Sequence, residues 1–163
     1  MITPFSSVFK IGIPLSIILF IQFYFATNHT IDTQEILPTY VSYIQIGTVM
    51  LGVFLSCTDH KKKFENKVMK YSEAIGCGVL TVAFAAIMFS LFIFFYLYFN
   101  PEVGKSLEEI SRKHMTQEIP KDVFKLSPLN KSILAAVQSF IQTFMIGFIS
   151  SILIGFFVQK RTA

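Results

Sequence analysis

Residues 58–78 read TDHKKKFENKVMKYSEAIGCG, and they join a strongly basic segment to the start of a long apolar run. The segment from Thr58 to Lys70 holds five lysines in thirteen residues, at Lys61, Lys62, Lys63, Lys67 and Lys70. Lysines beside a membrane span favour the cytoplasmic side of the membrane. The stretch therefore predicts a cytoplasmic loop that leads into a transmembrane helix.

The composition of the whole chain is that of a membrane protein. Of its 163 residues, 53% are hydrophobic and only 15% are charged. No charged residue occurs from Ala74 to Pro101 or from Ser132 to Gln159. About 20 apolar residues suffice to cross the hydrocarbon core of a bilayer. These observations predict an all-α integral membrane protein that forms one domain over residues 1–163.

Apolar runs and helix-start signals divide the chain into four predicted transmembrane helices. Thr3-Pro4 and Ser127-Pro128 are typical of helix starts, with a capping hydroxyl followed by proline in the first turn. The first span stands where a signal peptide would, but it lacks a basic leading segment and an Ala-x-Ala cleavage motif, so we expect it to be retained. The four spans are predicted at about residues 5–27, 37–57, 71–99 and 131–158.

An amphipathic segment separates the third and fourth spans. Over residues 101–118 apolar residues recur near helical spacing among charged ones, and the segment is too polar to cross a membrane. We therefore expect it to lie as a helix on the outer surface.

The distribution of basic residues predicts the orientation. The first loop, residues 28–36, has no lysine or arginine, whereas the loop after the second span has five lysines and the tail adds Lys160 and Arg161. Residues 101–131 contain six basic residues, but five acidic ones lie among them. The pattern places both termini in the cytoplasm of a bacterial cell, with the protein in the inner membrane.

The same lysines bear on the partners of the protein. Because the basic residues lie in loops beside predicted spans, membrane topology explains them and nucleic acid is not an expected partner. Clustered lysines at a membrane surface also attract anionic lipid headgroups, which are a further candidate partner besides the bilayer itself.

Small residues recur every four positions in the fourth span. The row consists of Ala135, Ser139, Thr143, Gly147, Ser151 and Gly155. In the third span, Ala74 and Gly78 have the same spacing. Small residues let membrane helices approach closely, so we predict that both sets mediate helix packing. The alternative is a narrow pore that small residues line.

Polar residues within the predicted spans are few. Gln138 and Gln142 lie one helical turn apart, Gln22 and Gln45 are the other glutamines within the spans, and Glu73 stands at the start of the third span. Hydrogen bonds between helices explain the glutamines, and an ion pair at the membrane surface explains Glu73. The alternative is a transport path along Gln138, Gln142 and Glu73.

The sequence provides no pattern for catalysis. His29, His60 and His114 lie in separate loops, and neither an HExxH nor a GxSxG motif occurs. We expect Cys57 and Cys77 to be buried free thiols, and we expect neither a metal nor a cofactor. The alternative is a metal site at which both cysteines meet Asp59 and His60.

The layout resembles a family of small four-span bacterial membrane proteins, the domain of unknown function forty-one ninety-nine. The resemblance includes the basic loop, Tyr71 with Ala74 and Gly78, the aromatic exit of the third span at residues 94–101, the amphipathic segment and the final span before Lys160 and Arg161. Tyr71 stands where the family more often has phenylalanine. The resemblance implies a four-helix membrane protein and no assigned activity.

The sequence is compatible with two functions. The leading hypothesis is a non-enzymatic accessory or packing subunit that associates through small-residue faces with a second copy or with another membrane protein. The alternative is a small transporter or channel component that uses the sparse polar residues of the spans.

Overall fold

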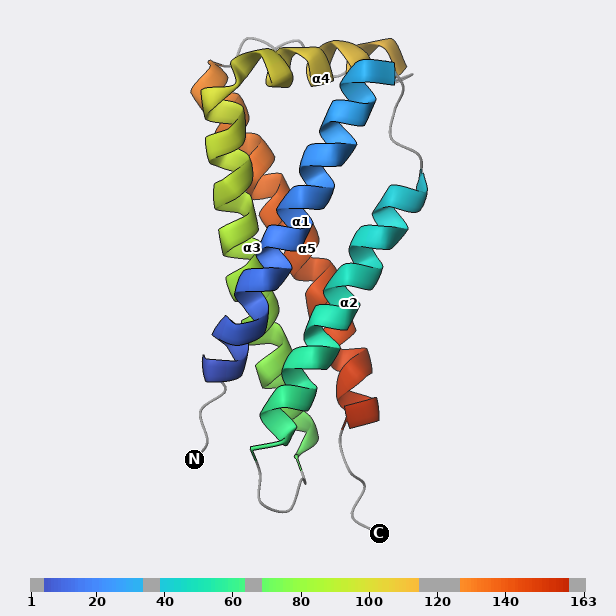
Figure 1. The fold of residues 1–163 in the computed structure, drawn as a ribbon, viewed down its shortest axis with the longest axis vertical. Helices are drawn as coiled ribbons and strands as arrows, with labels where there is room; N and C mark the ends of the chain where they lie inside the picture. Colours follow the sequence, from blue (N-terminus) through green and yellow to red (C-terminus); the bar gives the residue numbers. More distant parts are fainter. Residues whose placement is uncertain (1–4, 34–38, 64–68, 115–126, 159–163) are drawn as a thin grey trace.

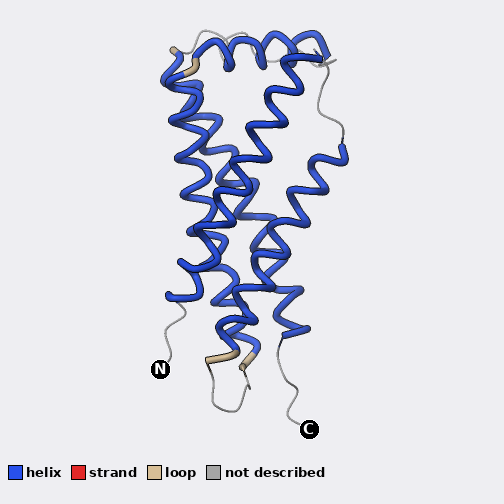
Figure 2. The backbone as a smooth tube through the Cα atoms, in the orientation of Figure 1, coloured by secondary structure: helices blue, strands red, loops and turns tan. Residues whose placement is uncertain are grey.

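The structure is a computed structural model in which the described residues are 5–33, 39–63, 69–114 and 127–158. Within these ranges the secondary structure consists of five helices and no strand. Figure 2 shows the backbone coloured by these elements. The helices are α1 (Phe5–Thr33), α2 (Thr39–Lys61), α3 (Tyr71–Phe99), α4 (Pro101–His114) and α5 (Pro128–Val158). Four of them run along the bundle and α4 lies across one end, while α1 begins and α5 ends at the opposite end (Figure 1).

Three of these helices have the length and the apolar composition to cross a membrane. They are α1, α3 and α5, with 29, 29 and 31 residues. Helix α2 has 23 residues but is less hydrophobic, because polar residues such as Gln45, Thr48 and Ser56 interrupt its apolar ones. The all-helical fold is therefore as expected, whereas three spans rather than four are supported, and the second span stays a prediction.

The ends of the helices follow local hydrogen bonding. Helix α1 continues to Thr33, through residues that the sequence analysis assigned to the first loop, and Thr33 Oγ1 donates to the His29 carbonyl at 2.8 Å. Asn100 closes α3 by donating from its backbone and side-chain nitrogens to Tyr96 O, at 3.0 and 2.9 Å. Helix α4 is described to His114, so the last predicted residues of the amphipathic segment, 115–118, lie outside the described residues.

Helices α3 and α5 share the most extensive contact in the bundle. A Cβ atom added at Gly147 would lie 2.1 Å from Val82 Cγ1, and one added at Gly78 would lie 2.6 Å from Ser151 Oγ. Near the end of α5, a Cβ atom at Gly155 would lie 2.9 Å from Tyr71 Cε2. The two backbones thus approach so closely that these glycine positions leave no room for a side chain.

Helix α1 packs on α3 through aromatic rings and also contacts α2. Phe23 lies edge-on to Phe89 and to Tyr96, with ring centroids 6.3 and 6.2 Å apart. Between α1 and α2, Leu15 fills the space over Gly52, where an added Cβ would lie 2.6 Å from Leu15 Cδ2. The outward faces are apolar as well, which suits helices that contact lipid.

Substituting Gly147 by alanine tests the contact between α3 and α5. The new methyl group would overlap Val82, whose branched side chain is stiff in a helix, so the helices must separate. We expect the G147A variant to lose about 1–3 kcal/mol of stability, measured by thermal or denaturant unfolding in detergent.

Gly76 provides the matched control within the same helix pair. A Cβ atom at Gly76 would meet nothing within 4 Å, and alanine favours a helix over glycine by about 1 kcal/mol. The G76A variant should therefore be as stable as the wild type or more stable. Equal effects of the two substitutions would contradict close packing at Gly147.

Candidate functional site

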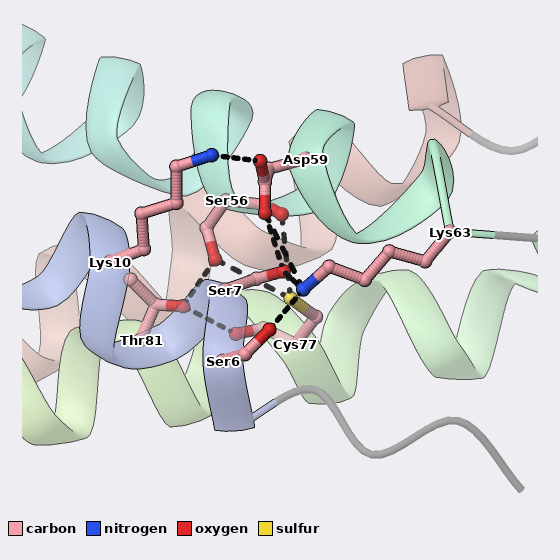
Figure 3. A network of polar contacts seen from close by, with 8 residues as sticks. All are labelled: Ser6, Ser7, Lys10, Ser56, Asp59, Lys63, Cys77 and Thr81. Carbon is pink, nitrogen blue, oxygen red and sulfur yellow. Dashed lines mark hydrogen bonds and ion pairs between the residues drawn. The ribbon is translucent and has the colours of Figure 1, made fainter.

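A polar cluster ties α1 to α2 at the end of the bundle where α1 begins, which we call the basic end (Figure 3). Lys10 Nζ lies 2.8 Å from Asp59 Oδ1, and Lys63 Nζ lies 3.5 Å from Asp59 Oδ2. Ser7 Oγ donates to Asp59 Oδ2 at 2.8 Å, and Lys63 also bonds to the hydroxyl groups of Ser6 and Ser7. One carboxylate thus joins residues from both helices.

Two ionisable groups in this cluster have shifted pKa values. Hydrogen bonds from Lys10 and Ser7 lower the pKa of Asp59 to about 2, so Asp59 is charged at neutral pH. Burial lowers the pKa of His60, and the neighbouring charge of Lys63 lowers it further, so His60 is neutral at pH 7. The cluster is therefore a lysine–carboxylate network, with a neutral histidine beside it.

A second hydrogen-bonded group joins α2 to α3 next to the cluster. Thr81 Oγ1 donates to Cys77 O at 2.8 Å, so the Ser56 hydroxyl, 2.6 Å away, is the donor to Thr81. The Cys77 thiol lies 3.4 Å from Ser56 Oγ, and the Cys57 thiol donates to Ala74 O at 3.3 Å. Both cysteines are buried and free, and these side chains bond to one another or to backbone.

The described residues do not support the metal alternative. Within the described ranges, no group of three or more histidine, cysteine, aspartate or glutamate side chains is arranged to hold a metal ion. Asp59 is instead bonded to Lys10 and Ser7, and Cys57 to a backbone carbonyl. The polar groups at the basic end therefore act as links between helices.

The predicted lysines that the structure describes lie at the basic end. Lys61 Nζ donates to Val158 O, which places a positive charge at the carboxyl end of α5. Lys62 is exposed, and the Lys70 backbone nitrogen donates to Glu73 Oε2 at 2.9 Å at the start of α3. Lys67 lies outside the described residues.

The small-residue row of α5 faces α3 along part of its length. Thr143, Gly147, Ser151 and Gly155 are buried, whereas Ala135 and Ser139 are half-buried. On α3, Ala74 and Gly78 are buried, and Gly78 lies against Ser151. These positions of the row are thus covered by a helix of the same chain.

The structure separates the three residues of the predicted transport path. Gln142 lines a cavity of about 490 Å³, to which α1, α2, α3 and α5 contribute. Gln138 and Gln142 are both exposed, but Gln138 does not line that cavity. Glu73 lies at the basic end, where it accepts a hydrogen bond at the start of α3. Of the three residues, this cavity therefore includes Gln142 and neither Gln138 nor Glu73.

The cavity brings together polar residues that the sequence did not group. It lies in the half of the bundle nearer α4, and the polar residues in the described part of its lining are Gln22, His29, Ser42, Gln45, Ser139 and Gln142. The glutamines were visible as polar residues within predicted spans. Their convergence depends on how the helices are rotated about their axes, which the spacing along one helix does not reveal.

Comparison with known proteins identifies the family. The chain matches the family described as protein of unknown function (DUF4199) over residues 10–160. Because the match covers most of the chain, the protein belongs to this family, which confirms the resemblance inferred from the sequence. No curated protein and no solved structure matches the chain.

Proposed function

We propose that the protein is a four-span, non-enzymatic accessory subunit of the bacterial inner membrane that forms a homodimer through α5. Helix α2 is long enough to be the fourth span, since 23 residues extend over about 35 Å and the hydrocarbon core is about 30 Å thick. Its polar Ser56 is fully buried, whereas Tyr43, Leu51 and Phe54 are exposed. The lower hydropathy of α2 thus comes in part from inward-facing residues.

The charges at the two ends of the bundle support a cytoplasmic basic end. Lys10, Lys61, Lys62, Lys63 and Lys70 gather where α1 begins and α5 ends. At the other end, α4 carries both signs, and Glu108 pairs with Lys131 of α5 at 2.6 Å. The excess of lysine at the basic end favours the cytoplasmic side, next to anionic lipid headgroups.

Thiol labelling tests this orientation. In a background that lacks Cys57 and Cys77, a cysteine replacing the exposed Glu109 of α4 should react with an impermeant reagent in intact spheroplasts. A cysteine replacing the exposed Lys62 should react only after the cells are lysed. The reverse pattern would place the basic end outside the cell. Labelling of both cysteines without lysis would contradict the placement of the two ends on opposite sides of the membrane.

Gln138 is the observation on which the proposed homodimer rests. It is exposed in the middle of an apolar face of α5, where Leu134, Ile141 and Met145 are 49%, 54% and 52% exposed. An amide in hydrocarbon lacks hydrogen-bond partners, and an amide both donates and accepts, so two copies of Gln138 are complementary to each other. The buried part of the small-residue row is used within the chain, which leaves this face for association.

A Gln138→Leu substitution tests the dimer. Interhelical hydrogen bonds in membranes contribute about 0.6–2 kcal/mol, so the dimer dissociation constant should rise about 3- to 30-fold. The measurement is the monomer–dimer equilibrium in detergent micelles, by light scattering or by analytical ultracentrifugation. The Gln142→Leu variant is the control, because Gln142 is also exposed but its amide lies beside the polar groups of the cavity, and it should dimerise like the wild type.

Two results would contradict the proposed dimer. One is a wild-type protein that stays monomeric at every concentration tested. The other is a dissociation constant that is the same for Gln138→Leu, Gln142→Leu and the wild type. A dimer that is insensitive to the substitution at Gln138 would form through a surface other than this face of α5.

A transporter or channel component is the second candidate function, and the cavity is the observation that favours it. The cavity occupies the half of the bundle nearer α4. A route across the membrane would also need passage through the other half, where Ser56, Cys77 and Thr81 are buried and bonded to one another. Such a route would require these buried side chains to move apart, whereas an accessory function does not.

A further inference from the structure

The cavity near α4 lies at the lipid-facing edge of the bundle. Ile21 and Phe25 of α1 and Ile44 of α2 line it, and these residues are 46%, 67% and 52% exposed on the surface of the bundle. On the inner side, Leu19 and Phe89 line the cavity and are buried. A molecule could therefore reach the cavity from the hydrocarbon region between α1 and α2.

A glutamine on the cavity wall has a fixed orientation. The Thr48 hydroxyl donates its single proton to Ile44 O at 2.9 Å, so Thr48 Oγ1 can only accept a second hydrogen bond. Gln22 Nε2 donates to that oxygen at 2.8 Å. The nitrogen of the Gln22 side-chain amide therefore faces Thr48, and its oxygen points away from Thr48.

This amide oxygen lacks a donor. Gln22 Oε1 is buried and has no hydrogen-bond partner in the described part of the chain. A buried acceptor without a partner is unfavourable, because it has lost its hydrogen bonds to water. This oxygen has almost no accessible surface, but Gln22 also lines the cavity, so a small local adjustment would let a ligand with a hydroxyl or amide proton satisfy it.

The lining of the cavity limits the chemistry of such a ligand. Among the described residues, the lining contains no lysine, arginine, aspartate or glutamate, and His29 is its one basic side chain, so a charged headgroup would be desolvated there with little counter-charge. Gln45, Gln142, Ser42 and Ser139 add neutral donors and acceptors, and most of the remaining lining is apolar. A volume of about 490 Å³ is typical of small-molecule sites.

We propose that this cavity binds a neutral lipid with a free hydroxyl group in its headgroup, of the diacylglycerol type. The hydroxyl donates to Gln22 Oε1, and part of an acyl chain lies against Leu19 and Phe89. The rest of the lipid extends between α1 and α2 into the bilayer. Gln138, on which the proposed dimer rests, does not line this cavity, so the preference for a hydroxyl does not depend on the dimer.

Native mass spectrometry of the full-length protein in detergent tests the site. The probes are dioleoylglycerol, its methyl ether (in which the hydroxyl proton is replaced by a methyl group) and dioleoylphosphatidate, which has the same chains and a charged headgroup. We expect dioleoylglycerol to bind about tenfold more tightly than the methyl ether, because only the free hydroxyl donates to Gln22. The phosphatidate should bind more weakly than dioleoylglycerol.

Two substitutions assign the effect to the cavity. Gln22→Leu should abolish the preference for the hydroxyl over the methyl ether, whereas Gln138→Leu, the same change on an exposed face outside the cavity, should leave the preference intact. Ser139→Phe places a ring at the cavity wall and should reduce binding of both neutral probes. It provides a second test if Gln22→Leu fails to fold.

Several outcomes would overturn the proposal. Absence of dioleoylglycerol binding would leave water as the partner of Gln22. Equal binding of the alcohol and its methyl ether to the wild type would remove the role of the hydroxyl. Tighter binding of the phosphatidate would indicate a basic site elsewhere, and full binding to Ser139→Phe would place the lipid outside this cavity. Because binding is read on each oligomer by mass, failure of the dimer is a separate result.

Discussion

The close approach of α3 and α5 is the interaction on which the rest of the bundle depends. In lipid, expulsion of water supplies little force between helices, so contact area between closely spaced backbones has to supply it. Gly147 under Val82 and Gly78 under Ser151 provide that area. Helix α1 then adds aromatic contacts to α3, and α2 packs against α1, α3 and α5. A bulkier residue at Gly147 or Gly78 would therefore push α3 and α5 apart.

The two ends of the bundle are built differently, and this difference suggests a division of roles. At the basic end, Asp59 joins Lys10 and Lys63, and Lys61 bonds to the last turn of α5, so charge pairing joins the helices at the end that we propose faces the cytoplasm. The half nearer α4 instead contains the cavity, with a buried amide oxygen that has no partner in the described residues. The proposed lipid site thus lies in the half opposite the charge-paired end.

The sequence predicted which residues lie at helix faces better than it predicted their partners. The four-residue row marked one face of α5, but only the fold identifies α3 as the helix that covers its later part. The hydropathy of α2 alone does not identify it as a transmembrane helix. Inward-facing polar residues such as Ser56 lower the mean hydropathy as much as exposed ones would. Gln142 was grouped with Gln138 because they are close in sequence, whereas the cavity groups it with Gln22 and Gln45 of other helices.

A disulfide between positions 78 and 151 tests most directly whether the small-residue row is used within one chain. A Cβ atom at Gly78 would lie 2.9 Å from Ser151 Cβ, and disulfides need about 3.5–4.5 Å, so a small shift suffices. With Cys57 and Cys77 removed, mild oxidation of a Gly78→Cys, Ser151→Cys protein should consume both thiols and leave a monomer on a non-reducing gel. A cross-linked dimer, or two thiols that stay free, would contradict the account.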